Sequence, residues 1–265
     1  MSPKPAIYNF ASALLLAICT LFLFATGAAA ADSNNHPKDG AAAKVAASDA
    51  YGKLPLSFEP NQGQTDQQVK FLSRGPGYAL FLTPAEAVFT LRTPNGKRNA
   101  QKSLLPISAK PFEHELATKY SVLRIGLEHA NSGPRISGTD ELPGKSNYFV
   151  GKDPKKWHSN IPTYRKVKYS GVYPGVDLVY YGNQRQLECD FVVAPGADPN
   201  TIGLKFTGAR RLSIDKDGDL VAQLRGGKVI EHAPLIYQEI DGVRRPIAGG
   251  YRLKRDHTVG FKLAG

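Results

Sequence analysis

Cysteine is nearly absent from this chain, whose 265 residues contain only Cys19 and Cys189. Cys19 lies in an N-terminal segment that we expect to be removed, so Cys189 would be left alone and an internal disulfide is excluded. A thiol nucleophile needs an activating neighbour and access. Cys189 lies instead within an apolar run, which favours a small buried side chain.

The signatures of common catalytic and metal sites are also missing. The sequence contains no Gly-x-Ser-x-Gly elbow and no phosphate-binding loop. The histidines from residue 54 onward are scattered without ligand spacing: His114, His129, His158, His232 and His257. We therefore expect no metal site, no cofactor and no enzymatic activity.

Helical periodicity is missing too, since no long segment repeats apolar residues every three to four positions. From residue 54 onward, short apolar runs alternate with Gly, Pro, Asn and Asp, as in chains of β-strands. The runs are residues 78–82, 87–91, 123–127, 212–214, 220–224, 229–230, 235–240, 243–253 and 259–263. They predict an all-β, antiparallel β-sandwich-like domain over residues 54–265, built as one domain or as two lobes. Residues 95–119 are interpreted as an insertion loop or the seam between lobes.

An apolar segment opens the chain. Lys4 supplies a positive start, residues 11–25 are apolar, and residues 28–31 are the small residues that signal peptidase requires. The run is shorter than the ~20 residues of a membrane span, so residues 1–31 are interpreted as a signal peptide. Residues 32–53, rich in Ala, Asn, Asp, Ser and Lys, predict a flexible linker. The mature chain is expected to be extracellular, at the cell surface or in the periplasm, without a transmembrane span.

A β-hairpin is predicted between Tyr173 and Pro195, with polar residues 182–186 at its turn. Its predicted opposite pairs are Gly182 with Leu187, Tyr181 with Glu188, Val179 with Asp190, and Asp177 with Val192. The other face then forms the predicted core: Val176, Leu178, Tyr180, Cys189, Phe191 and Val193. A slip by one residue would bury two carboxylates, so this register is favoured.

Three acidic residues lie on the polar face of this hairpin: Asp177, Glu188 and Asp190. Asp177 and Asp190 are diagonal neighbours, which lie ~7 Å apart in a sheet. Such a pair fits the acid and base of an inverting glycosidase, or the ligands of a hard cation. The same residues also fit an ordinary solvated strand face, which we favour because no acidic loop of calcium-site pattern accompanies them.

Basic and aromatic residues alternate in the tract 152–168. The candidate ligand-binding residues are Lys155, Lys156, Trp157, Arg165 and Lys166, which together could hold a polyanion or a sugar face. A solvated basic surface with Trp157 and Tyr164 buried as anchors fits the pattern better. Without Lys4 the mature chain keeps 33 basic against 23 acidic residues. For an exported chain we expect acidic polysaccharide or a surface protein as partner, and no nucleic acid.

Several longer motifs follow in a fixed order: residues 54–64 (LPLSFEPNQGQ), 140–151 (DELPGKSNYFVG), 153–157 (DPKKW), 162–164 (PTY) and the hairpin at 173–195. Together they resemble the N-terminal domain of bacterial SBBP (β-propeller) repeat proteins, over nearly all of residues 54–265. The resemblance implies an extracellular or cell-envelope module and carries over no catalytic residue.

The sequence departs from this family in two places. It ends where relatives continue into β-propeller-type repeats, which suggests a truncated or split product. Cys189 stands where the family more often has an aromatic residue, which implies a slightly under-filled core. Within the first motif, residues 59–64 fit either a ligand loop or a structural turn built on Asn61 and Gly63.

These observations favour a secreted or cell-envelope module that is structural or binds a partner and is not catalytic. Two alternatives stay open. One is a carbohydrate-active hydrolase that uses the carboxylates of Asp177, Glu188 or Asp190. The other is a binder of acidic polysaccharide through the basic and aromatic tract.

Overall fold

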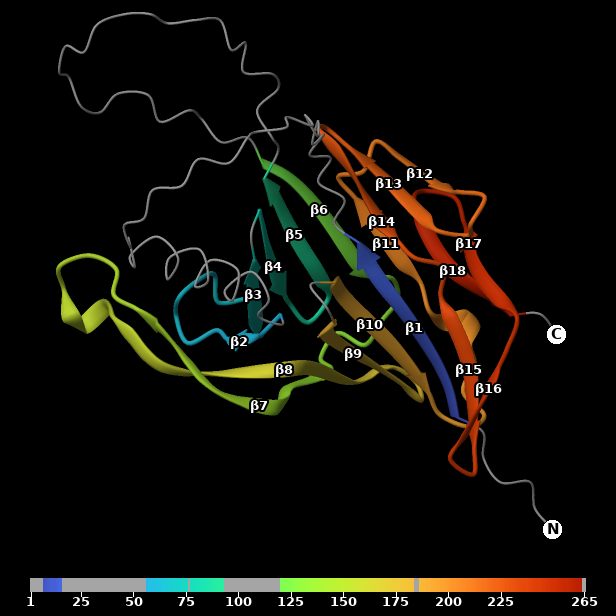
Figure 1. Ribbon diagram of the computed structural model, residues 1–265, viewed down its shortest axis with the longest axis horizontal. Helices are drawn as coiled ribbons and strands as arrows, with labels where there is room; N and C mark the ends of the chain where they lie inside the picture. The colour runs from blue at the N-terminus through green and yellow to red at the C-terminus, as the bar shows by residue number, and fades with distance from the viewer. Residues whose placement is uncertain (1–6, 16–55, 76, 93–119, 184–185, 264–265) are drawn as a thin grey trace, which may run out of the picture.

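A computed structural model describes residues 7–15, 56–75, 77–92, 120–183 and 186–263 (Figure 1). These residues contain no α-helix, and their two short 3₁₀ turns are η1, Pro154–Lys156, and η2, Pro199–Thr201. The predicted all-β, antiparallel fold is confirmed. Within the same ranges, the structure has no helix of the length and hydrophobicity that a bilayer span requires.

The strands form two antiparallel sheets. The ten-stranded sheet has the order β12 (Arg211–Ile214), β13 (Leu220–Leu224), β14 (Gly227–Glu231), β1 (Ile7–Leu15), β10 (Gln186–Val193), β9 (Val176–Asn183), β8 (His158–Tyr173) and β7 (Arg135–Tyr148). Beside this path, β15 (Leu235–Ile240) pairs with β1 and with β16 (Val243–Pro246). The eight-stranded sheet has the order β17 (Gly249–Leu253), β18 (Thr258–Leu263), β11 (Leu204–Thr207), β6 (Tyr120–Leu127), β5 (Glu86–Arg92), β4 (Tyr78–Leu82), β3 (Phe71–Gly75) and β2 (Glu59–Pro60).

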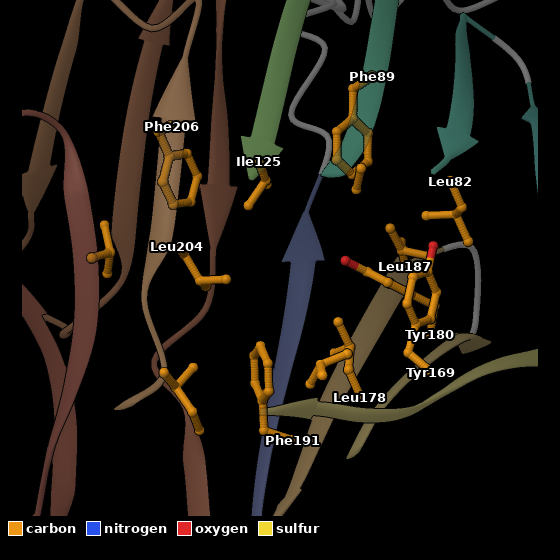
Figure 2. Packing of buried hydrophobic residues seen from close by; sticks show 14 of the residues in the cluster. Leu82, Phe89, Ile125, Tyr169, Leu178, Tyr180, Leu187, Phe191, Leu204 and Phe206 are labelled. Carbon is orange, nitrogen blue, oxygen red and sulfur yellow. The ribbon is translucent and has the colours of Figure 1, made fainter. Parts of the chain in front are cut away.

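One hydrophobic core joins the two sheets. Alternate residues of each strand point into it, because successive side chains of a strand face opposite sides. In Figure 2, Phe89, Ile125 and Phe206 come from the eight-stranded sheet and Leu178, Tyr180 and Phe191 from the ten-stranded sheet. The Tyr169 hydroxyl on β8 also donates a 2.9 Å hydrogen bond to the backbone oxygen of Thr83, in the turn before β5.

The predicted register of the β9–β10 hairpin is confirmed. Gly182 pairs with Leu187, and the three further predicted pairs follow in order. Five of the six predicted core residues are buried: Val176, Leu178, Tyr180, Phe191 and Val193. Cys189 is partly buried against the same core and helps to line a small apolar pocket beside Tyr180 and Phe191. A pocket at this place is consistent with the slightly under-filled core that the resemblance implies at Cys189.

Most of the predicted strands are confirmed, and residues 78–82 and 235–240 form β4 and β15 with the predicted bounds. The prediction of one strand over residues 243–253 is wrong, because β16 and β17 belong to different sheets. Pro246 has no N–H to continue the pairing of β16. A Cβ on Gly249 would lie 2.5 Å from the Cδ1 of Ile236, so the chain passes closely between the sheets there.

Part of the predicted signal peptide is described as a strand. Residues 7–15 form β1, drawn in blue between β10 and β15 in Figure 1. Removal of the leader stays a prediction. The predicted linker at 32–53 and the predicted insertion at 95–119 lie outside the described residues.

Candidate functional site

The β7–β8 hairpin projects from the body of the molecule and is the longest strand pair that the structure describes (Figure 1). No residue of β7 is buried, whereas β8 buries one face along most of its length, including Ile161, Thr163 and Val167. A register shift between Leu142 and Lys145 accommodates Pro143 and Gly144 as an irregularity in the strand. The pairing of the two strands was missed in the sequence, because β7 buries neither face and so shows no alternation of apolar residues.

A polar cluster fastens this hairpin to the start of the domain. The carboxylate of Glu59 on β2 accepts hydrogen bonds from the Ser146 hydroxyl (2.8 Å) and from the Tyr148 hydroxyl. Arg74 on β3 donates a 2.7 Å hydrogen bond to the Tyr148 oxygen, and its guanidinium carbon lies 5.1 Å from the centre of that ring. We call Glu59, Arg74, Ser146 and Tyr148 the brace.

The brace changes the acidity of Tyr148. Burial raises the pKa of its hydroxyl to about 12, helped by its hydrogen bond to Glu59 and by the negative charge there, against the opposing effect of Arg74. The hydroxyl therefore keeps its proton at physiological pH and remains a donor to Glu59.

The loop at residues 59–64 contacts the start of β8, close to the brace. The Asn61 amide donates to the backbone oxygens of Asp66 (2.7 Å) and Val69 (3.0 Å), and its oxygen accepts from the Gly63 N–H (3.1 Å). Gly63 has φ +110°, and a Cβ there would lie 2.8 Å from the Cε1 of His158. These contacts support the structural-turn interpretation of the loop, which packs against the start of β8.

The tip of the hairpin carries exposed apolar residues. Phe149, Val150 and Trp157 are 63%, 71% and 39% exposed. The rings of Phe149 and Trp157 meet edge to face, with centres 5.2 Å apart and an interplanar angle of 76°. The Trp157 indole N–H donates a 3.2 Å hydrogen bond to the backbone oxygen of Gly151, which fixes the ring at the tip.

Lysines surround this aromatic pair. Lys152, Lys155 and Lys156 are all exposed, and the last two belong to η1. The carboxylate of Asp153 accepts a 3.0 Å hydrogen bond from the Lys155 backbone N–H and so caps η1. We call these lysines with Phe149, Val150 and Trp157 the tip.

The structure separates the predicted ligand-binding residues into two groups. Lys155, Lys156 and Trp157 lie together at the tip, whereas Arg165 lies eight residues along β8, roughly 25 Å away at the rise of an extended strand. Lys166 forms an ion pair with Asp140, with 2.8 Å between Nζ and Oδ2. Arg165 and Lys166 therefore do not belong to the same site as Trp157.

The prediction that Trp157 is a buried anchor is wrong, because its ring lies at the exposed tip. The other predicted anchor, Tyr164, is partly buried and packs edge to face against Phe71, with ring centres 6.1 Å apart. Phe149 and Val150 were not named as site residues from the sequence. The sequence feature that could have identified them is the apolar triplet 148–150. It lies next to the basic tract, in a segment without alternation of apolar residues.

Asp177 is engaged within its own strand pair. Its carboxylate lies 2.8 Å from Lys168 Nζ and accepts a 2.7 Å hydrogen bond from the Gly171 backbone N–H. Burial tends to raise the pKa of Asp177, but these two hydrogen bonds and the charges of Lys168 and Arg135 outweigh it and lower the pKa. Asp177 is therefore a stable anion.

The pKa of Asp190 is shifted in the opposite direction from that of Asp177. Burial raises the pKa of its carboxyl to about 6, and the charge of Glu188 adds to this effect, against a hydrogen bond from Tyr181 and the charges of Arg244 and Lys166. The Tyr181 hydroxyl donates to Asp190 at 3.0 Å. Glu188 lies beside the same tyrosine and lines the apolar pocket described above.

The remaining candidates form no metal centre. Within the described ranges, no three His, Cys, Asp or Glu side chains lie close enough to hold an ion. His158 packs on Gly63, and His232 lies 2.9 Å from the carboxylate of Asp219. His114 lies outside the described residues.

Residues 58–265 match a family model described as a domain of unknown function (DUF7948). The matched region contains the brace, the tip and every strand that the structure describes except β1. No curated protein and no solved structure matches the chain.

Proposed function

We propose that this chain, which belongs to the DUF7948 domain family, is an exported, non-catalytic β module that binds acidic polysaccharide through the tip of its β7–β8 hairpin. The leader pattern of residues 1–31 supports export. The resemblance of the motifs to the N-terminal domain of SBBP repeat proteins supports the same compartment, outside the cytoplasm.

The observation that carries the proposal is the composition of the tip. Large apolar side chains that remain exposed at the end of a braced hairpin are typical of contact surfaces. The ring of Trp157 offers a flat face for a sugar, and Lys155 and Lys156 beside it offer positive charge for carboxylate or sulfate groups.

The brace suits the hairpin to this role. An unsupported two-stranded ribbon is only marginally stable in water. The contacts of Glu59 with Ser146 and Tyr148 hold the outer part of the ribbon to the eight-stranded sheet. Binding then costs less ordering of the hairpin, because the tip is already presented in one arrangement.

A hydrolase remains the second candidate because of the two aspartates on the β9–β10 hairpin. The pKa of Asp190 is raised and that of Asp177 is lowered, the separation that an acid and a base require. Asp177, however, already contacts Lys168 and the Gly171 N–H, which favours a structural role for it.

The proposal is tested by binding of the exported chain to polygalacturonate, with neutral dextran as the comparison polymer. We expect binding to polygalacturonate that weakens steeply as salt screens the charges. Trp157→Ala and the double variant Lys155→Gln with Lys156→Gln should each weaken it about tenfold or more.

The matched control is the double variant Lys216→Gln with Lys228→Gln, which removes two positive charges away from the tip. Both lysines are exposed and lie in the β12–β13–β14 region. This variant should bind nearly as well as the unchanged chain. Equal weakening by the control, or binding that salt does not affect, would overturn the assignment of the tip.

A further inference from the structure

β1 is an interior strand of the ten-stranded sheet. On one side, residues 8–14 pair with residues 187–193 of β10, and Phe10 lies opposite Phe191. On the other side, residues 7–11 pair with residues 235–239 of β15, while Leu14 and Leu15 pair with the end of β14. In Figure 1, β1 separates β10 from β15 and β14.

The same residues belong to the predicted signal peptide, at 1–31. Their removal would open the sheet in its middle and separate β12, β13 and β14 from β10, β9, β8 and β7. The backbone N–H and C=O groups of β10 and β15 that pair with β1 would lose their partners. Leu187, Phe191 and Ile236, which are buried in the whole chain, would lose a neighbouring strand.

We infer that the exported chain accepts a β-strand from another polypeptide in the position of β1, antiparallel to β10. The inference rests on the proposed export, because the position becomes open only when the leader is cut. An interior position with strand edges on both sides is a stronger acceptor than one outer edge, because the added strand pairs along both of its own edges.

Residues 32–265 offer no good donor. Residues 32–53 are polar and alanine-rich without apolar alternation, and the tract 95–119 contains Pro106 and Pro111. Proline lacks the N–H that an interior strand must donate. The described strands outside β1 already belong to the two sheets. A second copy of these residues would have lost the same leader, so it is not the donor.

The residues that face the position define the donor's chemistry. Leu187, Cys189, Phe191 and Val193 point toward the core, so donor residues opposite them must be apolar or small. Glu188 and Asp190 alternate with them, so small or basic residues are favoured opposite these two carboxylates. The partner is therefore an extended, proline-free segment of about nine residues, apolar at every second position.

The first experiment tests the register in the whole chain, made by cell-free synthesis so that the leader stays attached. Ser12 lies directly opposite Cys189, and opposite residues of an antiparallel pair have Cα atoms about 4.5–5.5 Å apart, within disulfide range. In a Cys19→Ser background, Ser12→Cys should form a disulfide with Cys189 on mild oxidation. Ala13→Cys, one residue along and on the other face, should not.

The second experiment tests acceptance in trans. The chain is produced in an export-competent bacterium, and its intact mass shows whether residues 7–15 have been removed. A synthetic peptide of residues 7–15 that carries Ser12→Cys is then added, and a disulfide with Cys189 is measured by mass spectrometry. The control peptides carry Ala13→Cys, or Ser12→Cys together with Asn9→Pro and Ala11→Pro.

We expect removal of the leader and at least tenfold more disulfide with the Ser12→Cys peptide than with either control. A mature chain that does not fold alone is refolded with and without the peptide, and recovery only with the peptide would also support strand acceptance. Retention of residues 7–15 would overturn the predicted removal of the leader and this inference. Two outcomes would overturn strand acceptance and leave export intact. In one, the cleaved chain folds but forms no disulfide with the peptide. In the other, two cleaved chains dimerise and fill the position of β1 themselves.

Discussion

The hydroxyl of Tyr148 donates a hydrogen bond to the carboxylate of Glu59, which lies 89 residues earlier in the chain. The bond joins the end of β7 to β2, the first strand of the eight-stranded sheet. Arg74 donates to the same hydroxyl oxygen from β3, so three segments meet at one side chain. These polar contacts therefore hold the outer part of the projecting hairpin, next to its tip, against the eight-stranded sheet.

We expect Tyr148→Phe to lower the free energy of unfolding by about 1–2 kcal/mol, because a hydrogen bond to a charged carboxylate is lost and Arg74 loses its acceptor. Urea denaturation at pH 7 measures the difference. Tyr120→Phe is the control, because Tyr120 is 63% exposed at the start of β6 and its change should cost less than about 0.5 kcal/mol. Equal effects of the two substitutions would contradict a structural role for the brace.

The sequence was sufficient to predict the β9–β10 hairpin and its register. A slip by one residue would have moved Glu188 and Asp190 onto the face that holds Leu178, and burial of carboxylates excludes that arrangement. The β7–β8 hairpin could not be predicted in the same way. Its strand β7 buries neither face, and the strand is irregular where it contains Pro143 and Gly144.

Asp190→Asn should stabilise the protein above neutral pH. The carboxyl of Asp190 has a pKa of about 6 in the folded chain against 3.8 in the unfolded chain. Its favourable contribution is therefore complete below pH 3.8 and is lost as the pH rises through about 6. At pH 8 the variant should gain about 1–2 kcal/mol, less than the full shift implies because the carboxyl is partly solvated.

The gain should vanish below pH 3.8, where aspartic acid and asparagine are both neutral. Urea denaturation of both proteins from pH 3 to 8 measures it. A difference that does not depend on pH would contradict the raised pKa of Asp190.

Asp177→Asn should have the opposite effect. The pKa of Asp177 is lowered, so its charged form contributes stability above pH 3.8 that is lost as the pH falls through the lowered value. The variant should be about 0.5–1 kcal/mol less stable at pH 7, because the contact with Lys168 is partly exposed. The gap between the two proteins should close in strong acid.

The two aspartate variants also test the hydrolase alternative. We expect neither substitution to change the turnover of any glycan, since the proposed function is non-catalytic. Release of reducing sugar from a panel of acidic and neutral glycans measures this. Turnover by the unchanged chain that both variants abolish would favour the hydrolase.

Gly182→Ala should destabilise the fold at the end of β9. A Cβ at this position would lie 2.2 Å from the Cβ of Leu56, which is buried. We expect a loss of about 1–3 kcal/mol from overpacking. Gly133→Ala is the matched control, because a Cβ there meets nothing within 4 Å, and it should leave stability unchanged or slightly higher. Comparable losses in thermal or urea unfolding would contradict the tight contact with Leu56.

The candidate site was only partly accessible from the sequence. Lys155, Lys156 and Trp157 could be identified because basic and aromatic residues are close together in the chain. Phe149, which directly follows β7, completes the tip, and Glu59 on the other sheet contacts Ser146 and Tyr148 next to it. Contacts between distant segments leave no local pattern, and burial of Trp157 was inferred wrongly because exposed tryptophan is uncommon in the absence of a partner.

Fluorescence of Trp157 gives the most direct test of binding at the tip, because Trp157 is the only tryptophan in the chain. The exported chain is titrated with polygalacturonate at low salt, and the emission is followed again as salt is added. We expect the emission maximum to move to shorter wavelength as the ring leaves water, and to return when salt releases the polymer. Binding of the polymer in a sedimentation assay without any change in Trp157 emission would contradict the proposed site, and absence of binding would contradict the proposed function.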